Sequence, residues 1–338
     1  MAKAEEREPG DQPSHFPTGF RLPNRVILIG VGLYLVGLAV LLFRNGGFIG
    51  PDTFLVAILL AVVVMGQART FLRDWIPFVV IFFGWQLLRG YADQAARGGG
   101  FPVHETDLIV AERALFAGYL PTLVLQDWLY TPNVIRWWDL MATGFWAFHF
   151  VLALLFAFLL WVRNKEHYYR FVYALMALSF AGFATYVLFP AVPPWLAYEH
   201  GTITEQVYHV QWAVLLSDMN FGRNASWVME NGNPNNIAAM PSLHAAYPAL
   251  VFAFSMRYWR AFAPIALLYC FGLWFSIVYL GDHYVIDALA GIVYAVAAFL
   301  LLEAVYRRLA QRRASRANSY TIQEVVPSGP IRGSDSGT

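Results

Sequence analysis

The chain has 338 residues, of which 58% are hydrophobic and only 13% are charged, and its formal net charge is +1. A typical soluble domain carries about 25% charged residues, so this composition excludes an ordinary soluble globular protein and indicates a membrane protein. Both ends of the chain, residues 1–20 and 311–338, are rich in Pro, Gly, Ser and charge. They are predicted to be disordered tails on either side of a membrane domain at 21–310.

Long apolar segments dominate the chain between these tails. A helix needs about 20 mostly apolar residues to cross a bilayer. Eight segments approach this length: 26–44, 52–68, 75–90, 138–162, 170–190, 241–256, 261–280 and 284–305. The sequence therefore predicts an all-α integral membrane protein with about eight transmembrane helices.

The Lys and Arg residues are distributed unevenly over the two sides that eight crossings define. With the N-terminus placed in the cytoplasm, 17 of the 23 Lys and Arg residues fall inside. The other six fall outside: Arg44, Arg89, Arg97, Arg113, Arg136 and Arg223. Because Lys and Arg are enriched in cytoplasmic loops, both termini are predicted to be cytoplasmic.

Two longer segments, about 91–137 and 191–240, then lie on the outer face. The first contains a stretch, 104–120, with four apolar residues on one face of a helix: Leu108, Ala111, Leu115 and Phe116. Such a helix either lies on the membrane surface or packs on the other helices. The length of the second segment predicts a cap over the outer face rather than a simple turn.

Polar residues gather where the predicted helices reach the outer face. The sixth predicted span begins with PSLH at 241–244, and the eighth begins with HYVID at 283–287. One hairpin joins these two helix starts, so His244 and His283 are predicted to lie at the same depth.

Each of these helix starts has residues suited to phosphate chemistry. Pro241 fits the first turn of a helix, free N–H groups at a helix start bind anions, and Ser242 adds a hydroxyl donor. At the other start, Gly281 permits a tight turn and Asp282 is a favourable N-cap residue. The first of these starts is therefore predicted to be an anion site.

His283 and Asp287 are four residues apart and hence lie on one helix face. A carboxylate beside an imidazole fixes the tautomer of the ring and raises its basicity. Two histidines and one carboxylate suit phosphoryl transfer, in which one His attacks phosphorus and the second protonates the leaving alkoxide. A structural role is the alternative for a single histidine at a membrane interface.

These stretches resemble two signatures of the type 2 phosphatidic acid phosphatase superfamily, P-S-G-H and S-R followed by five residues, H, three residues and D. PSLH at 241–244 and SIVYLGDHYVID at 276–287 match them in spacing. The resemblance implies a six-helix phosphatase-type core without a metal or other cofactor. It also implies that His283 is the nucleophile, Asp287 its partner and His244 the general acid.

The chain departs from the superfamily pattern at the positions that contact phosphate. The first signature, a Lys, six residues and then Arg-Pro, is absent, and TYVLFPAVPPW stands at 185–195. Ile277 replaces the signature Arg, and Leu243 replaces the signature Gly. The same departures resemble the inositol phosphorylceramide synthase branch and its bacterial relatives, which move a phospho-headgroup between lipids.

Without the basic signature, other residues should neutralise the phosphodiester, whose single negative charge needs fewer cations than a monoester. Arg89 is the first candidate and Arg223 the second, and snorkelling to the interface is the alternative for Arg89. His149 is a further candidate headgroup contact, although a buried hydrogen bond to a neighbouring span is the favoured interpretation. Ser242 and Asp282 complete the expected substrate-binding residues.

The expected function is that of a membrane phospholipid headgroup phosphotransferase, with its active site on the extracytoplasmic face and, in a bacterium, in the plasma membrane. The alternative is a lipid phosphate phosphatase acting on phosphatidate, polyprenyl phosphate or a phosphorylated glycolipid precursor. A channel or transporter is disfavoured because the ionisable groups cluster at one face. We expect lipid substrates in the bilayer and no nucleic acid as partners; the oligomeric state and the lipids stay open.

Overall fold

The computed structural model describes residues 58, 62, 66–97, 101–217 and 236–325. In these residues the chain forms α3 (Ala68–Arg97), α4 (Thr106–Leu115), α5 (Pro121–Leu129), α6 (Trp137–Ala147), α7 (His149–Arg163), α8 (Lys165–Leu188), α9 (Pro194–Glu199), α10 (Val210–Leu216), α12 (Leu243–Tyr258), α13 (Ala263–Tyr279) and α14 (Val285–Val325). Within the described ranges, pairing between extended segments is confined to isolated bridges. The predicted all-α class is therefore confirmed for this part of the chain.

The chain divides into two compact units, Met1–Val80 and Ile81–Thr338. In the first unit, the rings of Phe71 and Trp75 stack with their centroids 4.9 Å apart. The second unit contains both helix starts that carry the two sequence motifs.

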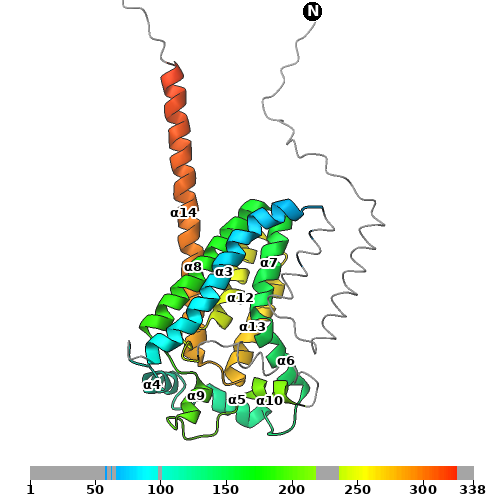
Figure 1. Cartoon of the computed structure of the whole chain (residues 1–338), viewed down its shortest axis with the longest axis vertical. Helices are drawn as coiled ribbons and strands as arrows, with labels where there is room; N and C mark the ends of the chain where they lie inside the picture. The colour runs from blue at the N-terminus through cyan, green and yellow to red at the C-terminus, as the bar shows by residue number, and fades with distance from the viewer. Residues whose placement is uncertain (1–57, 59–61, 63–65, 98–100, 218–235, 326–338) are drawn as a thin grey trace, which may run out of the picture. The chain divides into compact units, whose positions relative to one another are not determined.

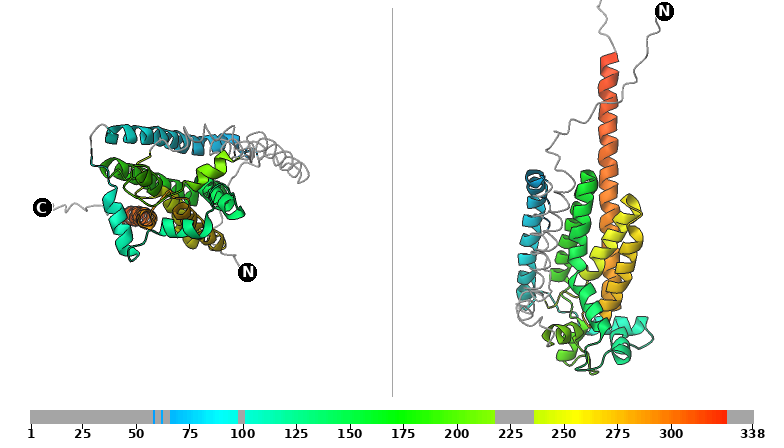
Figure 2. Two further views of the ribbon diagram at one scale, coloured as in Figure 1. Left: turned by 90° about the horizontal axis from the view of Figure 1, so that it is seen from below. Right: turned by 90° about the vertical axis from the view of Figure 1, so that its right-hand side faces the viewer.

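Helix α12 is the centre of the second unit. It contacts α7, α8, α13 and α14, and Figures 1 and 2 show α14 in orange running alongside α12 and α13. Ala245, Ala246, Leu250, Val251 and Phe254 on α12 are fully buried. Because two of these residues are alanines near its start, α12 can lie close to its neighbours there.

Four short helices, α4, α5, α9 and α10, gather at one end of this bundle, which we call the cap end (Figure 1). Helix α4 packs on α14, α5 on α13, and α10 on α6. These helices belong to the two long segments that the sequence analysis assigns to one face. The cap end also holds the starts of α12 and α14.

Membrane-spanning character is clear for some of the described helices. Helix α8 and residues Val285–Ser315 of α14 are each long and apolar enough to cross a bilayer. Helices α6 and α7 qualify together as a third crossing, and α13 is apolar but has only 17 residues. The predicted spans 26–44 and most of 52–68 lie outside the described residues.

Two predicted segments differ from the structure. The span predicted at 138–162 is broken at Phe148 into α6 and α7, whose axes differ by 53°. Helix α14 continues to Val325, so residues 311–325, predicted to begin a disordered tail, are helical. The prediction ended this helix where the apolar run ends, but a polar segment can continue an established helix because each added residue gains a backbone hydrogen bond.

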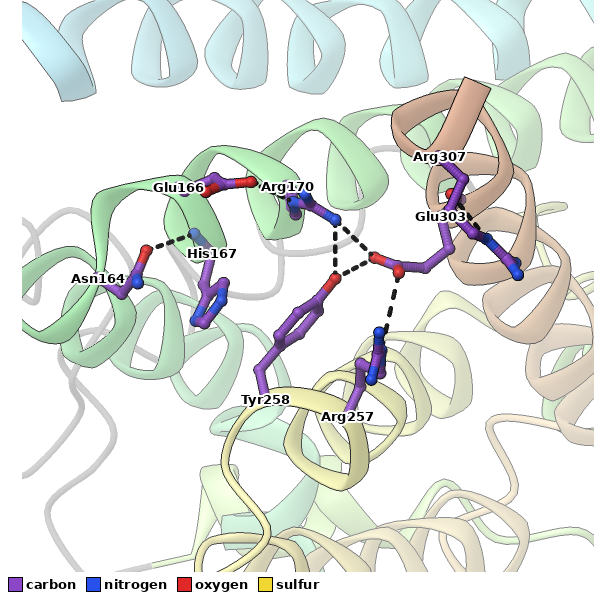
Figure 3. A network of polar contacts seen from close by, with 8 residues as sticks. All are labelled: Asn164, Glu166, His167, Arg170, Arg257, Tyr258, Glu303 and Arg307. Carbon is purple, nitrogen blue, oxygen red and sulfur yellow. Dashed lines mark hydrogen bonds and ion pairs between the residues drawn. The ribbon is translucent and has the colours of Figure 1, made fainter. Parts of the chain in front are cut away.

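At the end opposite the cap, an ionic network ties three helices together (Figure 3). Glu303 on α14 is almost fully buried and accepts a short hydrogen bond from the Tyr258 hydroxyl of α12. The Arg170 guanidinium of α8 lies 3.0 Å from the Tyr258 hydroxyl and 3.5 Å from Glu303 Oε1. Arg257 adds a second cation, 3.9 Å from Glu303 Oε2. This network fixes α8, α12 and α14 relative to one another.

Candidate active site

The start of α12 places His244 in the first turn of the helix. Ser242 is the N-cap residue, and its Oγ accepts a hydrogen bond of 3.2 Å from the Ala245 N–H. The predicted place of Pro241 in the first helical turn is therefore wrong, because Pro241 precedes the N-cap. The Ser242 side chain is fully buried, which gives its hydroxyl a structural function that the sequence analysis did not assign.

The turn between α13 and α14 places His283. Gly281 has a φ of +82°, a conformation that glycine adopts without strain, as the tight turn requires. The N–H groups of Asp282 and His283 both donate to the Ile277 carbonyl at 3.1 Å. The turn therefore closes back on the end of α13 before α14 begins at Val285.

The two histidines and the aspartate come together as the hairpin predicts. His244 Nδ1 lies 3.2 Å from His283 Nε2. On the other side of the His283 ring, Nδ1 lies 3.5 Å from Asp287 Oδ2, and Asp287 is fully buried. A carboxylate at Nδ1 favours a proton on that nitrogen, which leaves Nε2, the nitrogen that faces His244, as the nucleophilic one.

Close backbone contact fixes the distance between the two helix starts. The Ser242 N–H donates to the Asp287 carbonyl at 3.0 Å. One turn further along α14, a Cβ atom added at Gly291 would lie only 2.2 Å from the Ser242 carbonyl oxygen. Gly291 therefore allows the approach that brings His244 to His283, and the sequence analysis did not identify it.

Two carboxylates accept hydrogen bonds from the backbone N–H groups at the start of α14. Asp287 Oδ2 accepts from the Tyr284 N–H at 2.9 Å. Glu112 of α4 accepts from the Val285 N–H at 2.8 Å and from the Ile286 N–H at 3.1 Å. Protein carboxylates therefore occupy these N–H groups, which are not free to bind phosphate.

Glu112 is a residue that the sequence analysis missed. The buried residues of α4 are Leu108, Ile109 and Glu112, whereas the predicted face residues Ala111 and Leu115 are exposed. Helix α4 thus packs on the other helices, one of the two alternatives considered. The available signal was a glutamate four residues after Leu108, since residues at this spacing share a helix face.

The surroundings of Glu112 raise the pKa of its carboxyl group. Burial raises the pKa of the Glu112 carboxyl, the two backbone donors at Val285 and Ile286 oppose this shift, and the nearby charge of Asp287 adds to it. The net pKa of Glu112 lies above its ordinary value.

Asp282 has different partners from those predicted. It does not occupy the N-cap position, because α14 begins three residues later at Val285. Its Oδ1 accepts from Gln211 Nε2 at 2.6 Å and lies 3.2 Å from His209 Nε2. Burial raises the pKa of Asp282, but the hydrogen bond and charge of His209, together with the charge of His283, lower it, and the net pKa is below the ordinary value.

His149, on a third helix, α7, also lies at the candidate site. It is the first residue of α7, directly after the break, and its Nδ1 lies 2.7 Å from the Trp146 carbonyl oxygen. Since a carbonyl only accepts hydrogen bonds, this nitrogen carries the proton. The ring centroid of His149 lies 4.1 Å from that of His244. His149 is thus in contact with the histidine pair.

The side chains of the two arginines predicted to bind the phosphodiester lie outside the described part of the structure. Arg89 lies within α3, but its side chain is outside the described part of the structure, and Arg223 is outside the described residues altogether. Over the described ranges, neither His283 nor Asp287 has a Lys or Arg in ion-pair contact. Nor do three His, Cys, Asp or Glu side chains of these residues group with metal-ligand geometry.

Two polar atoms of the site are buried without a hydrogen bond. They are His283 Nδ1 and Asp287 Oδ1, although Asp287 Oδ2 lies 3.5 Å from His283 Nδ1 in an ion-pair contact. Buried polar groups in proteins are nearly always paired, and exceptions tend to mark functional groups. Other buried atoms of the described residues share this feature, for example Thr143 Oγ1 and Gln211 Oε1, so it supports a functional role only together with the geometry of the histidine pair.

Comparisons with known proteins give two matches. A family model described as the PAP2 superfamily matches residues 106–301, which include the whole candidate site. The chain is also 32% identical over 179 residues to a protein named phosphoinositol dihydroceramide synthase from Bacteroides thetaiotaomicron. That alignment covers 49% of this chain and 55% of the relative, so the chain spans about half the length of the relative. No solved structure matches the chain significantly.

Proposed function

Because the chain belongs to the PAP2 superfamily, an integral membrane family, we propose that it is a phospholipid headgroup phosphotransferase that uses a phosphohistidine intermediate. The observation that carries this proposal is the arrangement of His244, His283 and Asp287 at two helix starts that touch through their backbones. The name of the matched relative supports a phosphoinositol group as the group transferred and a dihydroceramide as the acceptor.

The first half-reaction forms the covalent intermediate. His283 Nε2 attacks the phosphorus of the donor phospholipid, and the bond from phosphorus to the diacylglycerol oxygen breaks. His244 gives its proton to that leaving oxygen. Asp287 keeps the proton on His283 Nδ1 and stabilises the ring as it gains positive charge.

The second half-reaction returns the enzyme to its starting state. The hydroxyl oxygen of the acceptor lipid attacks the phosphorus of the phosphohistidine, and the phosphorus–nitrogen bond breaks. His244 takes the hydroxyl proton, which restores it as the acid for the next cycle. Water in place of the lipid hydroxyl gives hydrolysis, so lipid phosphatase activity is the second candidate function of the same three residues.

Other residues are proposed to bind the substrate. Arg89 and Arg223 are the proposed cations for the phosphodiester, because the superfamily's basic signature is absent. Ser242, Asp282 and His149 are the proposed polar contacts around the headgroup. Ser242 stands two residues before His244, Asp282 directly precedes His283, and the His149 ring contacts that of His244.

The proposed topology has eight transmembrane helices with both termini in the cytoplasm. The cap end and the active site then face away from the cytoplasm, in the plasma membrane if the host is bacterial, and the substrates reach the site as lipids of the bilayer. The uneven distribution of the 23 Lys and Arg residues supports this orientation.

A lipid transfer assay tests the proposed function. The purified protein is incubated with headgroup-labelled phosphatidylinositol, with and without a dihydroceramide or diacylglycerol acceptor, and the products are separated. We expect a new labelled lipid that requires both the acceptor and His283. Release of inositol phosphate or free phosphate alone, whether or not an acceptor is present, would make the protein a hydrolase and contradict the transferase proposal.

A further inference from the structure

We propose that Glu112 is a positioning residue, which holds the start of α14 so that His283 and Asp287 stand correctly for the chemistry. This inference rests on the proposed function, since it concerns how fast the proposed reaction runs. It assigns to α4, in the outer segment, a part in catalysis that the two sequence signatures do not contain.

Glu112 binds the start of α14 with its whole carboxylate group. Both carboxylate oxygens of Glu112 are used, one for the Val285 N–H and one for the Ile286 N–H. These are the first two residues of α14, whose N–H groups have no partner within the helix. Glu112 is fully buried and lies more than 170 residues before them in the chain. A carboxylate from another element thus caps this helix from outside.

The two carboxylates at this helix start act as a pair. Glu112 takes the N–H groups of Val285 and Ile286, and Asp287 takes that of Tyr284. Negative charge is favourable at a helix N-terminus, which offsets the burial of both groups. Because Asp287 must face His283 Nδ1 at the same time, any shift of this first turn moves the carboxylate relative to the imidazole.

Other contacts hold the turn before α14, whereas Glu112 bonds the first residues of α14 itself. Gln126 of α5 bonds the carbonyls of Tyr208 and Tyr279, and the Trp195 N–H bonds the Gly281 carbonyl. These bonds hold the end of α13 and the turn before His283. From α12, the Ser242 N–H bonds the Asp287 carbonyl. Among the described residues of the cap helices α4, α5, α9 and α10, it is Glu112 alone that bonds backbone beyond His283. Its loss should therefore displace Asp287 relative to His283 and leave the rest of the turn in place.

The test compares the wild type with Glu112→Gln in the full-length protein, using phosphatidylinositol and dihydroceramide in mixed micelles. Glutamine keeps the size of the side chain but turns one acceptor into an NH2 donor that faces a backbone N–H. The matched control is Glu199→Gln, since Glu199 is an exposed glutamate on the cap helix α9. Glu112→Asp keeps the charge but is too short to span both donors, and it is measured in the same way.

Two readouts are needed, and one of them does not depend on activity. Hydrogen exchange at the start of α14 should be about tenfold faster at Val285 and Ile286 in Glu112→Gln. The kcat should fall about 10- to 100-fold, the size of loss that a small displacement of a reacting group causes. KM should stay within about twofold, because Glu112 does not touch the lipid.

The outcomes separate the alternatives. Exchange or kcat like that of the wild type in Glu112→Gln and Glu112→Asp would overturn the inference. A smaller amount of phosphohistidine in the first turnover, formed at an unchanged rate, would show a merely structural role and also overturn it. A wild-type protein without transfer or hydrolysis would instead contradict the proposed function, and faster exchange in the variant would still support the cap on α14.

Discussion

Two polar clusters join α12 and α14, at opposite ends of the helix pair. At the cap end, His244 of α12 meets His283 and Asp287 at the start of α14. At the other end, Tyr258 of α12 meets Glu303 of α14 (Figure 3). Both clusters are largely buried within the same pair of helices, so their differences are informative about their roles.

The clusters differ in how completely their polar atoms are satisfied. Glu303 uses both oxygens, one toward Tyr258 and Arg170 and the other toward Arg257. At the cap end, His283 Nδ1 and Asp287 Oδ1 are buried without a hydrogen bond. A complete network stabilises and rigidifies a structure, whereas an incomplete one costs stability and persists where chemistry requires it. We therefore infer that the Glu303 cluster serves stability and the His283 cluster serves reaction.

The largest expected effect is on activity at the cap end. His283→Ala should lower kcat at least about 10³-fold, because it removes the proposed nucleophile, and His244→Ala should do nearly the same. Lipid transfer by the purified variants measures this. The control is His167→Ala, since His167 packs against Tyr258 in the other cluster with the ring centroids 4.3 Å apart. Equal losses in His167→Ala and His283→Ala would remove the distinction between the clusters.

The next effect concerns the distance between the helices. In Gly291→Ala the new Cβ would lie 2.2 Å from the Ser242 carbonyl oxygen, so α12 and α14 must separate. Overpacking of this kind costs about 1–3 kcal/mol, and kcat should fall as well because His244 and His283 move apart. Unfolding in detergent and the transfer assay measure the two effects.

Gly144 provides a matched control for that substitution. It lies in helix α6, and an added Cβ there meets nothing within 4 Å. We expect Gly144→Ala to keep the stability and kcat of the wild type. A Gly291→Ala protein with unchanged stability would mean that the helices yield easily at this contact.

A third prediction addresses stability at the opposite end. Glu303→Gln should lower the free energy of unfolding by about 1–3 kcal/mol, because its amide group would face the Arg257 guanidinium and lose charge-assisted bonds. The kcat should stay within about twofold of the wild type, since Glu303 is remote from the histidines. Glu166→Gln, at an exposed partner of Arg170, should change stability by less than about 1 kcal/mol. A large loss of kcat with intact stability in Glu303→Gln would contradict a purely structural network.

The sequence predicted the contact between the proposed reacting groups better than the residues that hold them in place. His244, His283 and Asp287 lie within short motifs whose spacing and hairpin bring them together, and the structure has them in contact. Glu112 reaches α14 only through the packing of a segment far away in the chain, and no local pattern encodes such a contact. The break at Phe148 and the contact at Gly291 likewise depend on neighbouring helices rather than on local propensity.

The smallest expected effect is a pH dependence at the edge of the cap end. The pKa of Asp282 is lowered in the folded protein: burial raises it, but the hydrogen bond and charge of His209, together with the charge of His283, lower it. The unfolded chain therefore binds this proton more tightly, so Asp282 contributes stability above the ordinary carboxyl pKa and loses it as the pH falls through the folded value. As the pH falls below the ordinary carboxyl pKa of about 4, the wild type should lose stability more steeply than Asp282→Asn in detergent unfolding measurements. The exposed Asp127 supplies the control, since Asp127→Asn should follow the wild-type curve. Parallel curves for the wild type and Asp282→Asn would mean that the neighbouring histidines, His209 and His283, do not stabilise the charged form of Asp282.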